Sequence, residues 1–549
     1  MNKKVCSFPI LFALLALLIG TCAVVFPASA QAAPTSTGSI TVSGTVASRY
    51  DAYQIFSANV VDGDSDAKIA TDLAWASDAV RDAALPVLHS AGMPNSQTTA
   101  QEAAEWLNTD SHLTSALSVQ LARSLQSSGA ELAALNAGTE AELPCGYWLI
   151  VADDDAIAQD EAGTAPIMAL VGGSAVTVKP KAATPKVKKH VLEDSTAAWQ
   201  KAADATVADD LYWRLSATVP AGLTAYDTYT VQFVDTMSVG LDPSKVATSM
   251  RMYVAAGADG GFDVVACEGG NVSSTPAKGW TDISSRCKVT VKGNAFTVRT
   301  GDLIAALGGA DAFTSGARVV AVYNAPLGAN CNRGATKGNP NEVFLRYPRS
   351  PFADQSGDAG FTRTPSDDAC AYTWGLSLIK RSSSDDKPLA GAKLRIIDDR
   401  GRILTTDGSW STDADACITT DADGHVELSG VDAGVYIVEE IAAPKGYTAF
   451  EGKRTVTVTA EGLDVKQVAT AKPKVTVSVE NPLRVDTADA RTGSIELSVL
   501  NTPSKEAGRG FMPSTGDRTL VLVAVLAAIG VAAIVVALVI KRGGGRREK

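Results

Sequence analysis

The sequence predicts a mainly β protein, a tandem of β-sandwich domains of which the N-terminal one carries helical insertions. Short strand-like runs recur along the chain with turn residues between them, which is typical of sandwiches. The 549 residues are enough for about three domains. Hydrophobic residues make up 46% of the chain and aromatic residues only 6%, which favours small sandwiches packed with Val, Leu and Ala.

The N-terminal end carries an export signal. Lys3 and Lys4 precede an apolar run over 8–25, and the small residues that end at Ala30 complete a signal peptide over 1–30. Near the C-terminus, residues 519–540 are uncharged and mostly aliphatic, long enough to cross a bilayer, and a basic tail follows. The chain is therefore predicted to be exported and held by a transmembrane span.

The first domain is expected over 31–181. It opens with a strand at 39–42, and strands return at 147–151 and 175–178. Between them a helix is predicted, because four leucines recur at a spacing of four residues: Leu113, Leu117, Leu121 and Leu125. A linker rich in Pro and Lys follows.

Two further domains are expected beyond the linker. The second, over 182–372, has strand-like runs at 212–219, 226–234, 288–291, 317–323 and 343–347. The third, over 373–505, again alternates short strands with turns. The remaining segment, 506–549, holds a short Pro-Thr-Gly motif, the apolar span and the basic tail.

Charge and motifs exclude several function classes. The chain has 60 acidic and 49 basic residues. Removing residues 1–30 and 516–549 leaves 58 acidic and 41 basic residues, a net charge of −17. Such a surface suits solubility outside the cell and argues against a nucleic-acid partner. No CxxC, HExxH, GxSxG or phosphate loop occurs, so no cofactor, metal site or ordinary enzymatic activity is predicted.

Cysteine content indicates disulfide bonds. An even number of cysteines follows the leader of an exported chain: Cys145, Cys267, Cys287, Cys331, Cys370 and Cys417. The sequence does not choose among their connectivities. Cys267 with Cys287 is the plausible local pair, because the two flank a turn-rich stretch between strand-like runs.

Strands interpreted at period two place a polar residue on an apolar face, once in each of three strands per domain. In the third domain Lys380, Glu440 and Asn501 take these positions, with Asn481 as an alternative to Asn501. In the second domain the positions fall to the following residues: Lys189, Asp235 and Asn341, with Asn339 sharing the parity of Asn341. Each domain thus offers one lysine, one acid and one asparagine to its core.

Burial would change the chemistry of these groups. Desolvation favours a neutral amine, which is a nucleophile, and a neutral carboxyl, which can polarise an amide and relay protons. The product would be a Lys–Asn amide, with loss of ammonia. On the residues alone, a buried salt bridge capped by an asparagine, or strand ends that reach solvent, explains the pattern better than a covalent bond does.

Family motifs coincide with these residues. Residues 436–447, YIVEEIAAPKGY, resemble the E-box of sortase-assembled pilins, with Val438 where the family usually has Leu. Lys380 with 387–392 resembles the first strand of a Cna B-type domain, and 501–503 its last. Residues 233–241 and 338–345 are similar to the middle domain of backbone pilins. The resemblance implies immunoglobulin-like, Cna-type sandwiches with two isopeptide bonds: Lys380–Asn501 with Glu440 as catalyst, and Lys189–Asn341 with Asp235.

Two further motifs concern assembly. Met512-Pro513-Ser514-Thr515-Gly516, followed by the apolar span and basic tail, resembles an LPXTG-type cell-wall sorting signal, with Met512 where the family usually has Leu. This resemblance implies cleavage by a sortase after Thr515. Residues 176–181 resemble the pilin motif, with Lys179 where the family usually has Tyr. By that resemblance, Lys181 attacks the sortase-bound threonine of another subunit.

These resemblances span nearly the whole chain and imply a backbone pilin, the structural shaft subunit of a covalent pilus with roles in adhesion and colonisation. It would be a sortase substrate whose only chemistry is its own isopeptide formation. The implied partners are a pilus-type sortase, identical subunits, minor pilins and peptidoglycan, with the chain secreted and anchored to the Gram-positive cell wall. The sequence does not identify a host ligand. The alternative is a monomeric wall-anchored adhesin, or a minor pilin at the tip or base.

Overall fold

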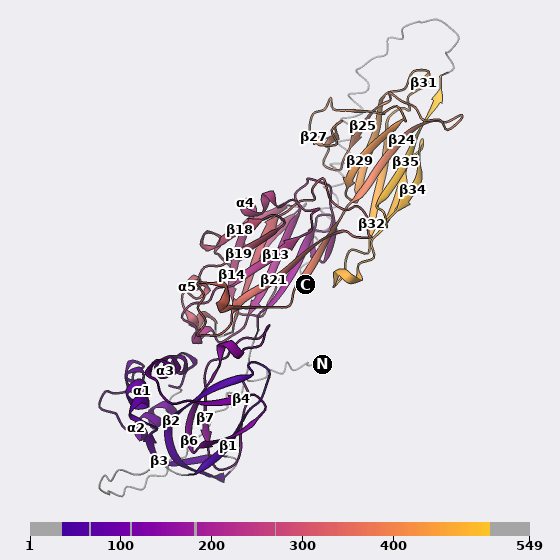
Figure 1. The fold of residues 1–549 in the computed structure, drawn as a ribbon. Helices are drawn as coiled ribbons and strands as arrows, with labels where there is room; N and C mark the ends of the chain where they lie inside the picture. The colour runs from indigo at the N-terminus through magenta and orange to yellow at the C-terminus, as the bar shows by residue number, and fades with distance from the viewer. Residues whose placement is uncertain are drawn as a thin grey trace, which may run out of the picture.

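The computed structural model describes residues 36–64, 67–109, 112–180, 184–268, 271–313 and 315–504. Three domains built mostly of strands follow one another in an elongated array (Figure 1), which confirms the predicted fold class. The predicted signal peptide (1–30), Lys181, the sorting signal (512–516) and the apolar span (519–540) lie outside the described residues. Among the helices of the described ranges, none has the length and apolar character needed to cross a membrane.

The N-terminal domain has two sheets and three helices, and the helices pack against the larger sheet. One sheet has the order β3-β2-β6-β7 with β4 on β2, and the other β5-β1-β8. The elements are β1 Thr37–Val42, β2 Arg49–Asp62, β3 Lys68–Trp75, α1 Asp78–Ser90, α2 Ala100–Asn108, α3 Ser115–Ser128, β4 Ala133–Asn136, β5 Glu140–Pro144, β6 Gly146–Ala152, β7 Ile167–Val171 and β8 Val176–Val178.

Helix α3 is the helix predicted from the leucine spacing. It begins after Thr114, whose hydroxyl accepts a hydrogen bond from the Leu117 backbone N–H at 3.1 Å. Leu117, Leu121 and Leu125 are buried as expected. The prediction was wrong for Leu113, which precedes the cap and is 38% exposed.

The middle domain is a two-sheet sandwich. One sheet has the order β10-β9-β12-β20-β14-β17, and the other β11-β23-β21-β13-β19-β18 with β22 on β21. Its elements are β9 Lys186–Glu193, β10 Ala198–Gln200, β11 Ala202–Asp204, β12 Tyr212–Val219, β13 Gln232–Met237, α4 Val246–Ser249, β14 Arg251–Ala256, β15 Val265–Glu268, β16 Asn271–Pro276, β17 Thr281–Asp282, β18 Lys288–Lys292, β19 Ala295–Arg299, α5 Leu303–Ala306, β20 Ala317–Asn324, β21 Asn339–Pro348, β22 Phe361–Arg363 and β23 Asp367–Tyr372.

The expected strand at 226–234 begins only at Gln232. Before it, side chains accept hydrogen bonds that a neighbouring strand would otherwise accept. The Tyr229 N–H donates to Asp302 Oδ1 at 3.0 Å, and the Val231 N–H donates to Thr300 Oγ1 at 2.9 Å. Tyr229 and Val231 are both buried as expected, but so is Thr230 between them.

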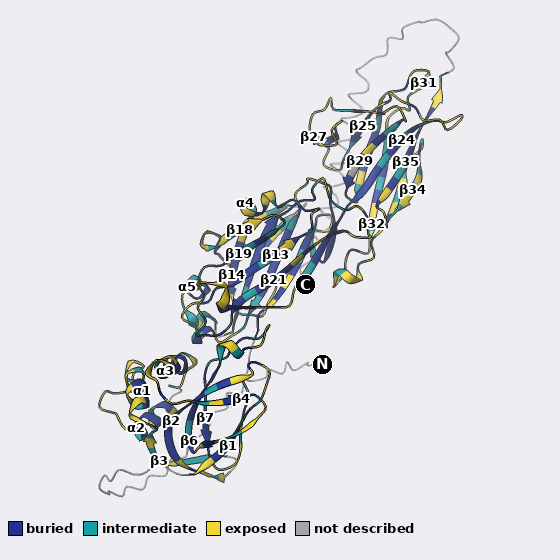
Figure 2. Cartoon of the chain, in the orientation of Figure 1, coloured by how far each residue is buried: buried dark blue, intermediate teal, exposed yellow. Residues whose placement is uncertain are grey.

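The C-terminal domain is a second two-sheet sandwich. Its sheets have the orders β29-β24-β35-β31, with β34 on β35, and β27-β26-β25-β30-β32-β33, with β28 on β25. The elements are β24 Trp374–Ser382, β25 Lys393–Ile397, β26 Ile403–Leu404, β27 Trp410–Ser411, β28 Ile418–Thr419, β29 His425–Val431, β30 Gly434–Ala442, β31 Tyr447–Thr448, β32 Lys453–Glu461, β33 Lys474–Val479, β34 Leu483–Asp489 and β35 Ser494–Pro503. Strands such as β21 and β24 alternate buried positions with exposed or half-buried ones, whereas β12 and β20 of the middle domain are buried almost throughout (Figure 2).

The disulfide prediction is not supported, because all six cysteines are free. The expected local pair is separated in the fold. Cys267 lies in the β15–β16 hairpin, whereas the Cys287 thiol donates to the carbonyl of Ile283 at 3.2 Å. Cys145 is buried in the N-terminal domain beside Val60. Even cysteine number was the basis of the prediction, and it carries no information on distance.

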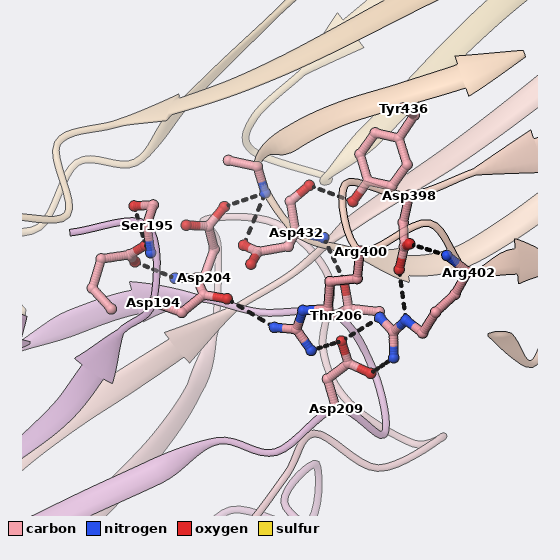
Figure 3. A network of polar contacts seen from close by, with 12 residues as sticks. Asp194, Ser195, Asp204, Thr206, Asp209, Asp398, Arg400, Arg402, Asp432 and Tyr436 are labelled. Atoms are coloured by element: carbon pink, nitrogen blue, oxygen red, sulfur yellow. Dashed lines mark hydrogen bonds and ion pairs between the residues drawn. The ribbon is translucent and has the colours of Figure 1, made fainter. Parts of the chain in front are cut away.

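A polar network joins the middle and C-terminal domains (Figure 3). Arg402 donates to both carboxylate oxygens of Asp209, each at 2.6 Å, and Arg400 reaches Asp209 at 3.0 Å and Asp194 at 3.1 Å. Bidentate pairing of this kind fixes orientation as well as distance. The arginines belong to the C-terminal domain and the acids to the middle domain, so the contact holds the two sandwiches in one relative orientation.

Behind the arginines, three carboxyl groups meet at the same boundary. Asp204 Oδ2 accepts hydrogen bonds from Trp374 Nε1 at 2.7 Å and from the Ala433 N–H at 2.9 Å. Burial, reinforced by the neighbouring acids, raises the pKa of Asp432 and raises that of Glu193 to about 7; burial also raises the pKa of Asp204. Burial at this interface therefore favours the protonated form of all three carboxyl groups.

The contribution of Glu193 to stability should fall as pH rises across this window. Between pH 4.5 and about 7, folded Glu193 keeps a proton that the unfolded chain releases, so for this group each rise in pH favours unfolding. The shift corresponds to a loss of about 3 kcal/mol for this group, and no further loss follows above its folded pKa. Buried His190, whose pKa burial lowers to about 4, contributes a slope of the opposite sign, so the test is a difference between variants. We expect the stability lost by Glu193→Gln relative to wild type, measured by denaturant titration at a series of pH values, to shrink as pH rises from 4.5 to about 7. The exposed Glu451→Gln should follow the wild-type curve, and a Glu193→Gln curve parallel to wild type would contradict the assignment.

Candidate functional site

The lysine, acid and asparagine predicted in the third domain lie together in its core. Lys380 Nζ donates to Asn501 Oδ1 and lies 3.3 Å from Glu440 Oε1, while Asn501 Nδ2 donates to the same Glu440 oxygen at 2.7 Å. The other Glu440 oxygen accepts the Phe450 N–H at 3.0 Å. The amine, the carboxyl and the amide therefore contact one another in all three pairs.

Strand register explains this meeting. β24 and β35 are parallel neighbours in which Lys380 is opposite Val499, so Asn501 lies one inward position further along. β30 of the facing sheet supplies Glu440. Period two therefore points all three side chains into the same space between the sheets.

Burial prepares the amine for reaction. The Lys380 side chain is fully buried, with the Phe450 ring 5.6 Å from Nζ. Burial lowers the pKa of Lys380 to about 8, although the adjacent Glu440 carboxylate opposes the shift. The neutral, nucleophilic amine is consequently far more populated than for an exposed lysine.

The middle domain brings its own three predicted residues to one buried position. Lys189 Nζ forms an ion pair with Asp235 and approaches the rings of Trp213 and Tyr323, each centroid at 5.5 Å. Burial lowers the pKa of Lys189 to about 8, against the opposing effect of Asp235. Burial likewise raises the pKa of Asp235.

Tyr323 is a member of this site that the sequence did not reveal. Its hydroxyl accepts hydrogen bonds from Lys189 Nζ and from Asn341 Nδ2, both at 2.9 Å, and donates to Asp235 Oδ2 at 3.1 Å. Asn341 Oδ1 and Asp235 Oδ1 are buried without a hydrogen-bond partner. The tyrosine thus connects the amine, the acid and the amide, and the amide carbonyl stays open to a proton donor.

The two sites distribute their groups differently. In the middle domain β9 carries the lysine in one sheet, while Asp235 on β13 and Asn341 on β21 lie in the other sheet as near neighbours. In the C-terminal domain the amine and the amide share a sheet and the acid faces them. A bond at the first site would join two sheets, and a bond at the second would join two strands of one sheet.

Neither competing asparagine reaches a lysine of these sites. Asn339 is buried, but its side chain bonds the backbone of Asn332 at 2.9 Å and the Ala371 carbonyl at 3.2 Å. Asn481 is exposed. β21 starts at Asn339, and the residue that meets the site is Asn341.

Comparison with known proteins assigns part of the chain. Residues 375–473 match the SpaA family, described as a prealbumin-like fold domain. We call the C-terminal sandwich the SpaA domain after this match, which covers most of it. The SpaA match includes Lys380 and Glu440 and ends before the strand that carries Asn501.

Individual relatives extend beyond the SpaA domain. A stretch of 153 residues is 26% identical to the trypsin-resistant surface T6 protein of Streptococcus pyogenes serotype M6, covering 26% of each protein, so the match spans about a quarter of that relative. The T6 backbone pilin structure of the same organism aligns with 85% of this chain and 98% of its own, at 15% identity and a TM-score of 0.46. The major pilin SpaD from Corynebacterium diphtheriae aligns with 85% of this chain and 98% of its own, at 14% identity and a TM-score of 0.42.

The geometry at both sites is suited to amide exchange. The lysine Nζ can attack Cγ of the asparagine, the Cγ–Nδ2 bond can break, and the adjacent acid can carry the amine proton to the departing ammonia. Each bond formed lowers the mass of the protein by one ammonia.

We expect this loss to be visible in the intact mass of the purified protein. The wild-type chain should be lighter than its sequence by two ammonia, after allowance for processing at its ends. Glu440→Ala in the SpaA domain and Asp235→Ala in the middle domain should each restore one, because each removes the proton carrier of one site. Glu439→Ala is the matched control, since Glu439 pairs with Arg395 instead and its loss should leave the wild-type mass deficit. A wild-type mass equal to the sequence would refute both bonds.

Tyr323→Phe should affect the middle domain alone. Removing the hydroxyl leaves Asn341 Nδ2 without its buried partner and leaves Asp235 Oδ2 with Lys189 as its remaining donor, at a cost of about 1–3 kcal/mol in the free energy of unfolding. We also expect incomplete ammonia loss at Lys189–Asn341, measured by mass spectrometry of fragments, with the SpaA domain unchanged. Tyr253→Phe, another buried tyrosine, whose hydroxyl bonds Ser274 at 3.3 Å, provides the control. Full cross-linking in Tyr323→Phe would show that the hydroxyl only fills space.

Proposed function

We propose that the chain is the backbone subunit of a covalent, sortase-assembled pilus on a Gram-positive cell wall. The observation that carries the proposal is the presence of one buried lysine–acid–asparagine cluster in each of two consecutive sandwiches, in a chain that also holds a SpaA domain. Homology to the T6 surface protein supports the same function. The elongated array of domains in Figure 1 suits a shaft.

The proposed bonds make each sandwich resistant to extension. Lys380 lies on the first strand of the SpaA domain and Asn501 on its last, so an amide between them lets tension bypass the residues in between. Lys189 likewise lies on the first strand of the middle domain. A shaft subunit needs this property because every subunit below the tip carries the full load.

Polymerisation uses a third lysine and the sorting signal. The sortase cysteine attacks the Thr515 carbonyl, the Thr515–Gly516 bond breaks, and Lys181 Nζ of another subunit then displaces the thiolate to form an amide. The residues just before Lys181 lie at the end of the first domain. The Val178 carbonyl accepts a hydrogen bond from the Ser43 backbone N–H at 2.8 Å, and the side chain of Lys179 is exposed. Head-to-tail joining of this kind generates an open polymer.

The alternative is a wall-anchored adhesin or a minor pilin. Such a protein would use Thr515 for attachment to peptidoglycan, or to another pilin, and would not use Lys181. Both alternatives keep the internal bonds, so only the linker lysine separates the shaft subunit from them.

Replacement of Lys181 tests the shaft assignment. Lys181→Arg keeps the positive charge but removes the nucleophilic amine, so we expect the high-mass ladder in cell-wall extracts to disappear on denaturing gels. Monomer should remain attached to the wall through Thr515. Lys179→Arg is the matched control and should leave the ladder intact. A ladder that persists in Lys181→Arg would sink the role of that residue.

A further inference from the structure

A row of basic residues crosses the outer face of the middle-domain sheet. Register places Lys288 of β18 opposite Arg299 of β19, Arg299 opposite Gln232 of β13, Gln232 opposite Arg346 of β21, and Arg346 opposite Arg363 of β22. Residues directly opposite in antiparallel strands share a face, and neighbouring strands are about 4.8 Å apart, so the row is roughly 20 Å long. We call the four cations among these residues the basic row; Gln232, in the middle, is neutral and buried.

The row points away from the core. The residues that follow or precede it along the strands, Val298, Phe233 and Leu345, are fully buried. Arg363 and Lys288 are exposed, and Arg299 and Arg346 are partly exposed. The four cations are therefore presented to solvent by a rigid sheet.

Like charges directly opposite on paired strands destabilise a sheet. Arg346 and Arg363 form such a pair, and both guanidinium groups lie over one ring, that of Phe344, at 6.0 and 5.2 Å. Arg299 lies 5.5 Å from the Phe361 ring. Stacking holds the planar groups in place. Arg299 Nη2 donates to the Gln355 carbonyl, whereas Arg346 and Arg363 line a groove.

The row ends in a groove beside the N-terminal domain. This cavity of about 370 Å³ is lined by Arg346, Arg363 and a further cation, Arg349, together with residues 157–159 of the first domain. Arg349 bonds only a backbone carbonyl, that of Asp154, at 3.4 Å. Within the described residues, one of the five cations of the row and groove has an ion pair: Arg346 with Asp358, at 3.2 Å.

Asp358, which pairs with Arg346 in the groove, shows where the carboxylate or sulfate group of a ligand could bind. Its side chain is 79% exposed, so a ligand can displace it without unfolding any element. The remaining excess of positive charge contrasts with a chain that is strongly acidic overall.

We propose that the basic row and its groove bind an acidic polysaccharide through sulfate or carboxylate groups. A linear chain with repeated charges matches a narrow row of cations of about 20 Å, in which arginine forks can each take one oxyanion. A nucleic-acid duplex fits less well, because the net negative charge of the chain would repel its wide phosphate backbone. An exported protein would also meet such polysaccharides outside the cell.

Binding to heparin, hyaluronan and neutral dextran, measured with the purified full-length protein at fixed ionic strength, tests the proposal. We expect binding to an acidic polysaccharide and none to dextran. Arg346→Gln with Arg363→Gln should weaken binding by at least about tenfold, because two charge-assisted contacts are lost. Asp358→Asn should strengthen it, because the competing carboxylate is removed. Binding to heparin alone would assign sulfate groups, and binding to both acidic chains would assign carboxylates.

The control variant carries the same change in net charge elsewhere. Arg251→Gln with Lys393→Gln removes two exposed cations, on β14 and on the SpaA domain, and should bind as the wild type does. Equal weakening in both double variants would overturn the proposal in favour of unspecific attraction. Absence of wild-type binding, or tighter binding to duplex DNA than to either polysaccharide, would overturn it as well. Thermal melts of each variant separate lost binding from lost folding.

Discussion

The burial of a lysine amine beside a carboxyl group is the constraint around which each of the two sandwiches is arranged. An isolated charge in such a core is costly, and removing one partner of a buried pair leaves the other exposed to that cost. The strands that carry Lys189 and Lys380 must therefore keep their position relative to the strands of the facing sheet that carry Asp235 and Glu440. Aromatic rings cover both sites, so the same packing that excludes water also lowers the pKa of each lysine amine.

The boundary between the middle and C-terminal domains applies the same principle to a surface between sandwiches. Arg400 and Arg402 satisfy acids at its rim, while Asp204 accepts from the Trp374 indole behind them. Because Trp374 opens the first strand of the SpaA domain, this bond ties the start of one sandwich to the core edge of the other. The two reactive sites are thus held in a fixed relation, in contrast to domains joined by a free linker.

Side-chain alternation made much of this predictable. The pleat of a strand fixes which residues face inward, so Lys189, Lys380 and their acids could be located from spacing alone, and the leucine helix followed from its period. Tyr323 could not be located in this way, because a tyrosine in an apolar run is indistinguishable from an ordinary core residue. Its hydroxyl is recognised as part of the site only when the fold places β20 opposite β13. The basic row was hidden for a related reason: its cations lie on four strands distant in sequence, and net charge averages over them. Cysteine number, which says nothing of geometry, misled.

The sequence separation within each site bears on export. A chain that leaves the cell N-terminus first delivers Lys380 before Glu440, and Asn501 last, 121 residues after the lysine. Asn501, whose amide group the lysine attacks, cannot reach the site until β35 has paired with β24 and the sheet is complete. A bond that requires this arrangement would form only in chains that have reached their native topology, and would then make that state irreversible. Formation of the amide would therefore mark chains that have folded after secretion. Chains that stop in a partly folded form would lack the bond and would remain sensitive to proteolysis.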